Sequence, residues 1–439
     1  MKILIAVHHF PPRYTGGAEW RVYRTAQALQ ARGYSVRVIC IERIDQGETQ
    51  EVTWRDEIFE GVAVRRLSFN LKNAPDPERW EFNNLWVREQ LRQLIQQEQP
   101  EILHLFSGYL MSGSVLALAH ELNLPSIVSL TDFWFLCRRL TMWRSNGQLS
   151  HLPLNPVTCA RCLGEERRLF RWPGRLMPQL MNIYWQRQTK RINLLQDRSA
   201  FLLHVLNQTH TIISPSQFLR SLFIQAGLNP HRIVYMRQGH DFPELTEERM
   251  KKTPAEHLRV GYLGQIAEHK GVHILLEALR YLPQAPLTVD IYGDFSAYPR
   301  YVSRLRRLAA NDGRIRLVGR YQRQSQLSSI LRNLDVLVMP SIWYENSPNV
   351  ILEAFAHHTP VIVSNLGGMA ELVINNKDGL YFTPGDAADL AQVMRRILNE
   401  PNLLSHLQSG IAPIKNLKQE IDELEAIYQN VVAAGRQAG

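Results

Sequence analysis

Cysteine is scarce in this sequence. Only four cysteines occur in 439 residues, whereas a scaffold held together by disulfides has more of them in a much shorter chain. No apolar run reaches the roughly 18 residues that a membrane-spanning helix needs. The sequence also has no short repeat of the kind that builds solenoids. These absences argue against a disulfide scaffold, a membrane-spanning protein and a repeat protein.

The N-terminus lacks the features of a signal peptide. In MKILIAVHHFPP the apolar run is short, and His-His-Phe-Pro-Pro stands where a small-residue cleavage site would be expected. The segment instead predicts a buried first strand. We therefore expect a cytoplasmic protein that touches a membrane only at its surface, as a peripheral protein on the inner face of the cell membrane.

The composition has room for two large cores and an excess of positive charge. The length suits two domains of about 200 residues each, and 45% of the residues are apolar. A formal charge of +9 favours anionic partners such as nucleotides, phosphates, nucleic acid or an acidic membrane face. Residues 165–198 hold eight basic and three acidic residues among many large apolar ones. This stretch is either a solvated helical face or a contact for a membrane or a lipid-linked acceptor.

Short apolar strands alternate with helical segments along the whole chain. One series begins at KILIAV (2–7), and a second begins at RVGYLG (259–264). This alternation predicts two consecutive doubly wound α/β domains. We expect the change between them near residues 236–258, where Pro243 and Pro254 flank a charged stretch. Further predicted strands lie at 34–41, 62–67, 102–106, 126–130, 211–214, 287–293, 315–319, 335–341, 360–364 and 380–382.

The stretch ENSPNVILE places Glu345 and Glu353 too far apart for a charge pair on a helix surface. The apolar strand DVLVMPS precedes it. Ser347 is predicted to cap the following helix, and Pro348 suits the first turn of that helix. We therefore expect both carboxylates in the crevice at the carboxyl end of a parallel strand, where such sheets bind ligands.

This arrangement suits a nucleotide sugar. The free amides of the helix N-terminus favour a diphosphate, and a carboxylate on each side can accept hydrogen bonds from sugar and ribose hydroxyls. Two helix-end glutamates without any ligand are the simpler alternative. Three further pairs are each weak indications, but together they favour the ligand site: Gly16-Gly17, Lys270-Gly271 and Gly367-Gly368.

With these motifs the sequence resembles the family 4 retaining glycosyltransferases, which have the GT-B fold. The E-x7-E motif is followed by AFAHHTPVIVSNLGGMAEL and NNKDGLYFTPGD. PPRYTGGAEW resembles the glycine-rich loop of the family, and VGYLGQIAEHKGVHILLEAL resembles the segment with its phosphate-binding basic pair. ISPSQF…YMRQGHDF resembles its interdomain connection, and TDFWFLC resembles an aromatic motif of one branch. The resemblance covers most of the chain.

The resemblance implies an α/β protein of the GT-B class, with two Rossmann-like doubly wound domains facing a central cleft. The N-terminal acceptor domain would span residues 1–240, with a loop and helical insertion at 137–200. The C-terminal nucleotide-sugar donor domain would span residues 241–414. A C-terminal helix within 415–439 would pack back on the N-terminal domain.

The activity implied is that of a retaining hexosyltransferase in polysaccharide biosynthesis. It would move a hexose-type sugar from a nucleotide-diphosphate sugar to a glycan, lipid-linked or small-molecule acceptor. In such enzymes the leaving diphosphate is thought to help deprotonate the acceptor on the same face, so neither a protein nucleophile nor a catalytic metal is required. An anionic membrane surface would be a further partner if the acceptor is lipid-linked, and nucleic acid would not be a partner.

The resemblance also assigns roles to individual residues. Glu353 would hold the ribose hydroxyls, Glu345 would meet the donor hexose, and Lys270 would neutralise the leaving diphosphate. Glycine at 16 and 17 lets the backbone approach donor and acceptor without a side-chain clash. The predicted catalytic residues are Lys270, Glu345 and Asp132. The predicted donor-binding residues are Gly16, Gly17, Gln265, Lys270, Glu345, Asn346, Ser347, Val350 and Glu353.

Two positions depart from the family pattern. Gln265 stands where the family usually has Arg, and Thr131 stands where it often has His, before Asp132. Glutamine carries no charge, so helix amides, His269 or an arginine elsewhere would have to replace the missing cation. A weakly active or inactive GT-B module that binds nucleotide sugar is therefore the alternative. A Rossmann oxidoreductase fits poorly because no GxGxxG follows an opening strand, and a sugar-nucleotide epimerase leaves E-x7-E unexplained.

Three of the four cysteines are close in sequence. Cys137 ends TDFWFLC, Cys159 and Cys162 form a CxxC pair, and His151 lies between them in a Gly/Asn/Pro-rich segment that predicts a loop. Three thiolates and one imidazole would complete a tetrahedral structural zinc site. The alternatives are buried reduced cysteines and a disulfide within the CxxC pair. A zinc ion here would pin a long irregular loop beside the acceptor cleft.

Overall fold

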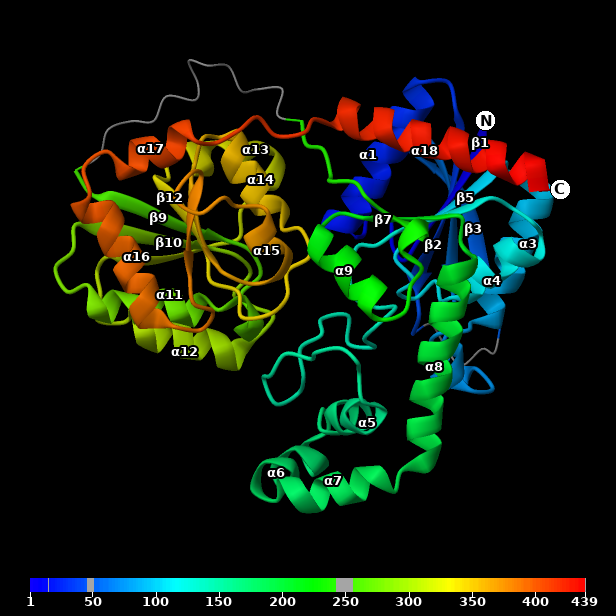
Figure 1. Cartoon of the computed structure of the whole chain (residues 1–439), viewed down its shortest axis with the longest axis horizontal. Coiled ribbons are helices and arrows are strands. Elements are labelled where there is room, and N and C mark those ends of the chain that lie inside the picture. Colours follow the sequence, from blue (N-terminus) through cyan, green and yellow to red (C-terminus); the bar gives the residue numbers. More distant parts are fainter. Residues whose placement is uncertain (15, 46–50, 242–255, 439) are drawn as a thin grey trace. The chain divides into compact units, whose positions relative to one another are not determined.

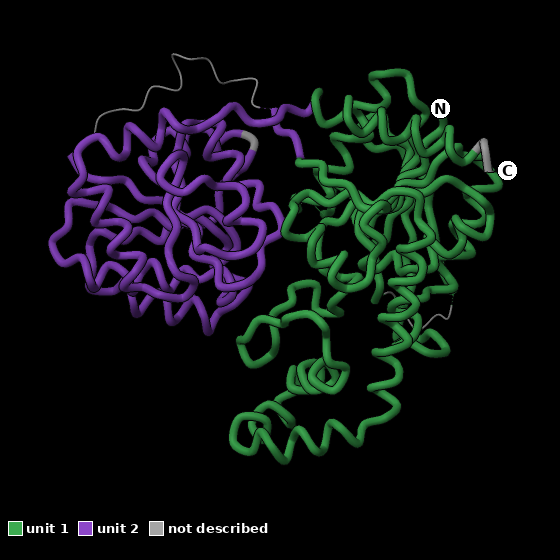
Figure 2. Tube along the Cα trace, in the orientation of Figure 1, with its two compact units in different colours: residues 1–237, 418–439 green, residues 238–417 purple. Residues whose placement is uncertain are grey.

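The chain folds into two compact α/β units (Figure 2). Unit 1 comprises residues 1–237 and 418–439, and unit 2 comprises residues 238–417. Each unit is built on one mostly parallel sheet, so the prediction of two doubly wound α/β domains is confirmed. The computed structural model describes residues 1–14, 16–45, 51–241 and 256–438.

The borders of the units lie close to the predicted domain borders. The chain leaves unit 1 at 237/238 and returns to it at 417/418, whereas the sequence predicted borders at 240/241 and 414/415. Pro243 and Pro254, expected at the change between domains, lie outside the described residues. None of the helices in the described ranges is long and apolar enough to cross a membrane.

Unit 1 contains an eight-stranded sheet with the order β3-β4-β2-β1-β5-β6-β7-β8. Neighbouring strands are parallel except β3 and β4, which are antiparallel. The central strands are apolar runs because both faces of a parallel sheet are covered. The sequence does not predict β3, which is largely exposed, or β8, which has three residues. The strands are β1 Lys2–Val7, β2 Ser35–Arg43, β3 Thr53–Phe59, β4 Val62–Ser68, β5 Ile102–Phe106, β6 Ser126–Ser129, β7 Thr211–Ser214 and β8 Ile233–Tyr235.

Five helices of unit 1, α2, α3, α5, α7 and α9, start where the sequence supplies a capping side chain or a proline. The Asn84 side chain, for example, accepts hydrogen bonds from the backbone N–H groups of Trp86 and Val87 and so fixes the start of α3. Figure 1 shows these helices around the sheet and in an arm at one end of it. The helices are α1 Gly17–Ala31, α2 Pro77–Trp80, α3 Leu85–Glu98, α4 Ser114–Glu121, α5 Pro156–Gly164, α6 Arg168–Leu176, α7 Pro178–Gln186, α8 Thr189–Gln208, α9 Gln217–Gln225 and α18 Leu417–Ala438.

Residues 156–208 form a helical arm, defined here as α5 to α8, which overlaps the predicted insertion at 137–200. The arm has a small core of its own, built from Ala160, Trp185 and Leu195. Figure 1 shows α6 and α7 at the end of the long helix α8, away from the sheet of unit 1. Helices α6 and α7 are therefore an addition to the α/β unit, whereas the second half of α8 is buried in unit 1 through Leu202, Val205 and Leu206.

The C-terminal helix α18 packs on unit 1. Arg21 of α1 donates two hydrogen bonds to Oε1 of Glu420, at 2.8 and 3.1 Å, and both side chains are buried. The Tyr428 hydroxyl lies 2.6 Å from Nδ1 of His104 on β5. Burial, helped by the charge of Arg21, lowers the pKa of His104 well below its usual value. These buried polar contacts fix the position of the helix on the first unit.

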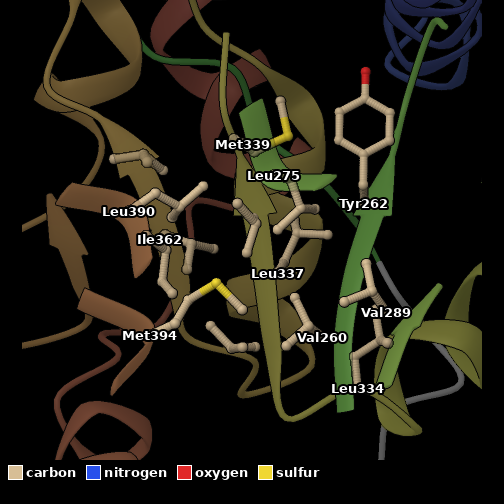
Figure 3. Packing of buried hydrophobic residues seen from close by; sticks show 14 of the residues in the cluster. Val260, Tyr262, Leu275, Val289, Leu334, Leu337, Met339, Ile362, Leu390 and Met394 are labelled. Carbon is tan, nitrogen blue, oxygen red and sulfur yellow. The ribbon is translucent and has the colours of Figure 1, made fainter. Parts of the chain in front are cut away.

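Unit 2 contains a six-stranded, fully parallel sheet with the order β11-β10-β9-β12-β13-β14. Its core gathers apolar side chains from the strands and from the flanking helices, such as Leu275 of α11 and Leu390 of α16 (Figure 3). The strands are β9 Leu258–Leu263, β10 Leu287–Tyr292, β11 Ile315–Gly319, β12 Val336–Met339, β13 Val361–Ser364 and β14 Gly379–Phe382. The helices are α11 Val272–Ala278, α12 Pro299–Ala309, α13 Arg323–Arg332, α14 Asn349–Ala356, α15 Gly367–Glu371, α16 Ala387–Asn399 and α17 Leu403–Ser409.

The strand order of unit 2 locates its ligand crevice. From β9 the chain proceeds outward to β10 and β11 on one side, and then to β12, β13 and β14 on the other. The order therefore reverses between β9 and β12. In open parallel sheets, ligands bind outside the carboxyl ends of the strands at such a switch point. The loop after β9 carries Lys270, and the loop after β12 carries Glu345.

Candidate functional site

Glu345 is buried in the loop between β12 and α14. Its Oε1 accepts three hydrogen bonds, from Lys270 Nζ at 2.7 Å, Ser341 Oγ at 2.8 Å and Trp343 Nε1 at 2.9 Å. Burial raises the pKa of this carboxyl, but the charge of Lys270 and the three hydrogen bonds outweigh burial and lower it. Glu345 is therefore an ionised carboxylate held in one orientation.

Lys270 lies at the end of a short 3-10 turn that follows β9. Its Nζ is 4.7 Å from the ring centroid of Trp343, which is the geometry of a cation–π contact. One of its three N–H bonds points to Glu345, which leaves two for a ligand. Gly271 follows with φ +71°, and a Cβ at this position would lie 1.8 Å from the carbonyl oxygen of Pro340. Glycine is therefore required to bring the loop of Lys270 against the loop of Glu345.

Glu353 lies in α14 and is only 1% exposed. Its Oε1 forms an ion pair with Arg323, the first residue of α13. Its Oε2 is buried and has no hydrogen-bond partner within the described part of the chain. A buried polar atom without a partner is costly to leave unsatisfied. This oxygen is therefore available to accept a hydrogen bond from a ligand.

The start of α14 leaves further polar groups unsatisfied. The helix begins at Asn349 with Pro348 at its N-cap and has no side-chain cap. The prediction that Ser347 caps this helix is wrong, because the chain is still extended at Pro348 and the helix starts beyond the reach of the serine. Ser347 Oγ and Asn349 Oδ1 are buried, and neither has a hydrogen-bond partner among the described residues. These groups, with the free N–H groups of the first turn, form a polar site at the switch point.

The other predicted donor-site positions lie around the same loops. A Cβ at Gly368 would lie 1.7 Å from the carbonyl oxygen of Asn346, so glycine lets α15 approach the loop of Glu345. Val350 is partly buried against the core of unit 2. Gln265 is exposed in the loop after β9, with its Nε2 3.5 Å from the hydroxyl of Tyr298.

Three residues of this site are missing from the sequence prediction. Ser341 and Trp343 precede Glu345 closely and bond to its carboxylate. Their closeness in sequence could have indicated them, because a buried carboxylate needs donors from its own loop. Arg323 belongs to a different strand–helix unit, and no local pattern connects it with Glu353. The sequence indicates only that helix amides, His269 or an arginine elsewhere would replace the missing cation.

The predicted glycine loop lies in unit 1, at the start of α1. Gly16 is the N-cap of α1, and Gly17 is its first residue. A Cβ at Gly16 would lie 2.5 Å from Oε2 of Glu19, so glycine allows this carboxylate to fold over the helix start. Oε1 of Glu19 lies 3.2 Å from Nε2 of His8. Burial raises the pKa of Glu19, but the contact with His8 outweighs burial and lowers it.

Asp132 follows β6 in unit 1 and is fixed by three neighbours. Its Oδ2 accepts hydrogen bonds from Ser107 Oγ at 2.6 Å and Thr131 Oγ1 at 3.1 Å. Its Oδ1 accepts one from the backbone N–H of Trp134 at 2.7 Å. Thr131, which stands where the resembled family often has histidine, therefore orients the carboxylate. The catalytic role of Asp132 stays a prediction.

The cysteines Cys137, Cys159 and Cys162 line one cavity at the base of the helical arm. None of the four cysteines of the chain forms a disulfide. Sγ of Cys162 accepts hydrogen bonds from the backbone N–H of Ser145 at 3.3 Å and from Arg139 Nη1 at 3.6 Å. Burial raises the pKa of Cys137, and it raises the pKa of Cys159 to about 12.

The predicted zinc site stays a prediction. The CxxC pair lies on α5, so Cys159 and Cys162 lie on one face of a helix, whereas His151 is exposed. Across residues 1–14, 16–45, 51–241 and 256–438, no group of three or more His, Cys, Asp or Glu side chains has the geometry of a metal site. An ion at the three thiols would therefore require the thiols to deprotonate and the loop of His151 to close on them.

Elemental analysis of purified protein checks the zinc prediction. About one zinc per chain is expected, and the double variant Cys159→Ser/Cys162→Ser should lose it. Cys40→Ala is the matched control, because Cys40 is a buried cysteine of β2. A metal-free protein whose unfolding temperature is unaffected by a chelator would contradict the prediction.

Two family models match this chain. The model described as "Glycosyl transferase 4-like domain" matches residues 16–239, which is half of the chain. The model described as "Glycosyl transferases group 1" matches residues 257–400. The first match covers the glycine loop and Asp132, and the second covers Gln265, Lys270, Glu345 and Glu353.

Curated relatives and solved structures resemble the chain over most of its length. The glycogen synthase of Mycobacterium tuberculosis is 24% identical over 425 residues, which is 91% of this chain and 87% of that protein. The crystal structure of a glycosyltransferase from Rickettsia africae has a TM-score of 0.64 at 17% identity, covering 98% of this chain and 99% of that one. The structure of Anabaena HepE in complex with UDP has a TM-score of 0.65 at 16% identity, covering 98% and 100%. At these identities the structures show that the fold is that of GT-B glycosyltransferases.

Proposed function

This chain belongs to the glycosyl transferase 4-like family of glycosyltransferases, and from this premise we propose that it is a retaining hexosyltransferase with a nucleotide-diphosphate sugar as donor. The observation that carries the proposal is the combination of the Glu345–Lys270 ion pair with the buried carboxylate of Glu353, whose Oε2 has no hydrogen-bond partner among the described residues. Both lie at the switch point of the unit 2 sheet. Relatives in complex with UDP and with UDP-glucose support a donor of this class.

The three charged side chains match the three parts of such a donor. The unsatisfied Oε2 of Glu353 accepts a hydrogen bond from a ribose hydroxyl. The diphosphate takes the two remaining N–H bonds of Lys270 and the free amides at the start of α14. Glu345, whose pKa is lowered, stays ionised and accepts a hydrogen bond from a hexose hydroxyl.

Lys270 acts mainly as the glycosidic bond breaks. The diphosphate gains negative charge in that step, so a fixed cation binds the transition state more tightly than the ground state. Glu345 and the ring of Trp343 hold this cation in place before the donor arrives. The leaving diphosphate then helps to deprotonate the acceptor on the same face, without a protein nucleophile or a catalytic metal.

The acceptor belongs to the glycan, lipid-linked or small-molecule classes. Several relatives have names that refer to polysaccharides. The lipopolysaccharide core biosynthesis glycosyltransferase LpsE of Rhizobium meliloti is 32% identical over 158 residues, which is 35% of this chain and 44% of that protein. These names support a role in polysaccharide biosynthesis.

Donor binding and product stereochemistry test the proposal. Unfolding temperatures are measured with UDP-, GDP- and ADP-hexoses, and one donor is expected to raise the temperature clearly more than the others. The anomeric configuration of the transferred hexose is then read by NMR, and retention is expected. Inversion, or the absence of stabilisation by any nucleotide sugar, would overturn the proposal.

A nucleotide-sugar-binding module without turnover is the second candidate. The observation in its favour is Gln265, which is exposed at the donor loop and carries no charge where the resembled family usually has arginine. Donor binding without transfer to any acceptor and without hydrolysis would establish this function.

Restoring the missing charge should preserve or raise activity. Gln265 is exposed, so Gln265→Arg places a second, unburied cation in the segment after β9 that also carries Lys270. The expected kcat lies between the parent value and about tenfold above it, because a charge pair at a protein surface contributes on the order of 1 kcal/mol. Gln265→Ala is the control for loss of the amide. A collapse of kcat in both variants would show that the glutamine has a role of its own.

A further inference from the structure

The end of the helical arm exposes large apolar side chains. Of the sixteen exposed large apolar residues in the described parts of the chain, seven lie between residues 169 and 184. On α6, Leu169 is 76% exposed, Trp172 68% and Leu176 72%. Scattered apolar residues are ordinary on protein surfaces, but a gathering of this kind marks an interaction site. The seven residues are Leu169, Trp172, Leu176, Met177, Leu180, Ile183 and Tyr184.

The three exposed side chains on α6 lie apart from the core of the arm, whereas Tyr184 of α7 also contacts Phe170 and Trp185 of that core. Leu169, Trp172 and Leu176 are three and four residues apart and so lie on one side of α6. The other side of the arm helices already has a core, where Phe170 of α6 and Met181 of α7 pack against Trp185. The exposed apolar face is therefore additional to the surface that the fold of the arm buries.

Positive charge accompanies this face. Residues 168–186, which contain α6 and α7, include no aspartate or glutamate. Arg168 and Arg175 lie along α6 beside the apolar stripe, because their spacing places them on the adjoining side of the helix. Five exposed basic side chains have no carboxylate partner among the residues the structure describes: Arg167, Arg168, Arg175, Arg187 and Lys190.

We propose that the face formed by α6 and α7 docks on the surface of an anionic lipid bilayer. An interfacial helix inserts Leu, Trp or Ile side chains at the boundary between headgroups and acyl chains, and its flanking Arg and Lys side chains bind the headgroups. Trp172 and Tyr184 have the amphipathic rings that favour this boundary. The face has both the apolar stripe and the unpaired cations, and no acidic residue that would be repelled.

If the protein is a glycosyltransferase as proposed above, docking on a bilayer also indicates which class of acceptor it uses. Both helices belong to unit 1, which contains the predicted acceptor domain. A bilayer at the arm would bring that unit to acceptors anchored in the membrane. We therefore infer that the acceptor is lipid-linked.

Vesicle binding without donor or acceptor tests the docking surface separately from catalysis. The full chain is sedimented with vesicles of phosphatidylcholine alone, and with vesicles of equal parts phosphatidylcholine and phosphatidylglycerol. Binding is expected to the anionic vesicles, with an affinity that falls as salt is added. Failure of glycosyl transfer would leave this result unchanged, so the two proposals are distinguishable.

Two variants separate the apolar and the charged contributions. Leu169→Ser/Trp172→Ser/Leu176→Ser should weaken binding at least about tenfold through loss of apolar burial. Arg168→Gln/Arg175→Gln/Arg187→Gln should weaken it about a hundredfold, because each basic residue contributes about fivefold near an anionic surface. The matched control is Ile58→Ser/Ile374→Ser, which removes side chains that are 77% and 54% exposed elsewhere, and it should bind as the parent does.

Three results would overturn the proposal. The first is a parent protein that does not bind anionic vesicles. The second is binding that both arm variants retain at the parent affinity while their unfolding temperatures also match the parent. The third is a parent protein that is a dimer and does not bind vesicles, together with an apolar variant that is a monomer. The face would then bind a second copy of this chain.

Discussion

Replacing Lys270 with alanine should lower kcat by about 10²–10³-fold, the cost typical of removing one donor aimed at developing charge. The donor Kd should change by less than about tenfold, because the diphosphate carries less charge in the ground state than in the transition state. Initial rates and donor titration calorimetry measure the two quantities. Lys72→Ala is the control, since Lys72 is an exposed lysine of unit 1. Equal losses in kcat and donor affinity would contradict the assigned role.

The same variant should destabilise unit 2, because it leaves Glu345 buried without its cation. Breaking a buried pair from one side costs about 3–5 kcal/mol, and Glu345 is 6% exposed. In the parent, the pKa of Glu345 in the folded state is lower than its usual value of 4.5. The ionised carboxylate therefore stabilises the folded protein above pH 4.5, and this stabilisation is lost as the pH falls through the pKa of the folded state. Without Lys270, burial raises the pKa of Glu345, so this contribution disappears at neutral pH.

The pH dependence of unfolding separates this electrostatic effect from general damage. The difference in unfolding free energy between parent and Lys270→Ala should be largest near neutral pH and should shrink below about pH 4.5. The double variant Lys270→Met/Glu345→Gln should recover much of the lost stability but none of the activity, because no charge is then left unpaired. A stability difference that is the same at every pH would show that the lysine acts through packing alone.

The sequence predicts the two sheets well because parallel strands buried on both faces are apolar runs. Runs such as Ile102–Phe106 and Thr211–Ser214 coincide with strands in the structure. β3 is not predicted because it is an exposed edge strand, and its residues show no burial pattern along the sequence. Polar exposure at a sheet edge protects against further pairing, and it also removes the pattern by which a strand is recognised.

The same holds for the site: features formed by residues close in sequence could be predicted, and contacts between residues far apart in sequence could not. Glu345 and Glu353 could be located because a strand, a loop and a helix start follow one another within a short stretch. The donors Ser341 and Trp343 fall in that stretch as well, but which groups bond to which oxygen depends on the path of the loop. Arg323 comes from the helix after β11 and meets Glu353 only through the tertiary fold. Sequence spacing gives no information about a contact of this kind.

Replacing Glu353 with glutamine should weaken donor binding about 5- to 150-fold. The buried carboxylate is expected to accept a ribose hydrogen bond at Oε2. In the glutamine variant the single oxygen stays with Arg323 and an NH2 group takes the place of Oε2, so the ribose hydroxyl loses its acceptor, at a cost of about 1–3 kcal/mol. Because ribose is present in both ligands, the nucleotide sugar and the free nucleoside diphosphate should lose affinity by the same factor. Glu345→Gln should instead weaken the nucleotide sugar more than the nucleoside diphosphate, since Glu345 is assigned to the hexose. Titration calorimetry with both ligands measures the two ratios.

Two control variants test whether the loss of donor affinity is specific to the Oε2 atom of Glu353. Glu400→Gln alters a carboxylate that is also paired with an arginine, Arg396, but lies at the end of α16 and is exposed, so donor affinity should stay at the parent value. Arg323→Lys keeps a cation at Oε1 of Glu353, so that the buried carboxylate stays ionised. If the ribose uses only the unsatisfied Oε2, donor affinity should change by less than about threefold in this variant, because the accepting oxygen remains. Loss of the sugar donor with unchanged nucleoside diphosphate binding in Glu353→Gln would place the hexose, and not the ribose, at this carboxylate.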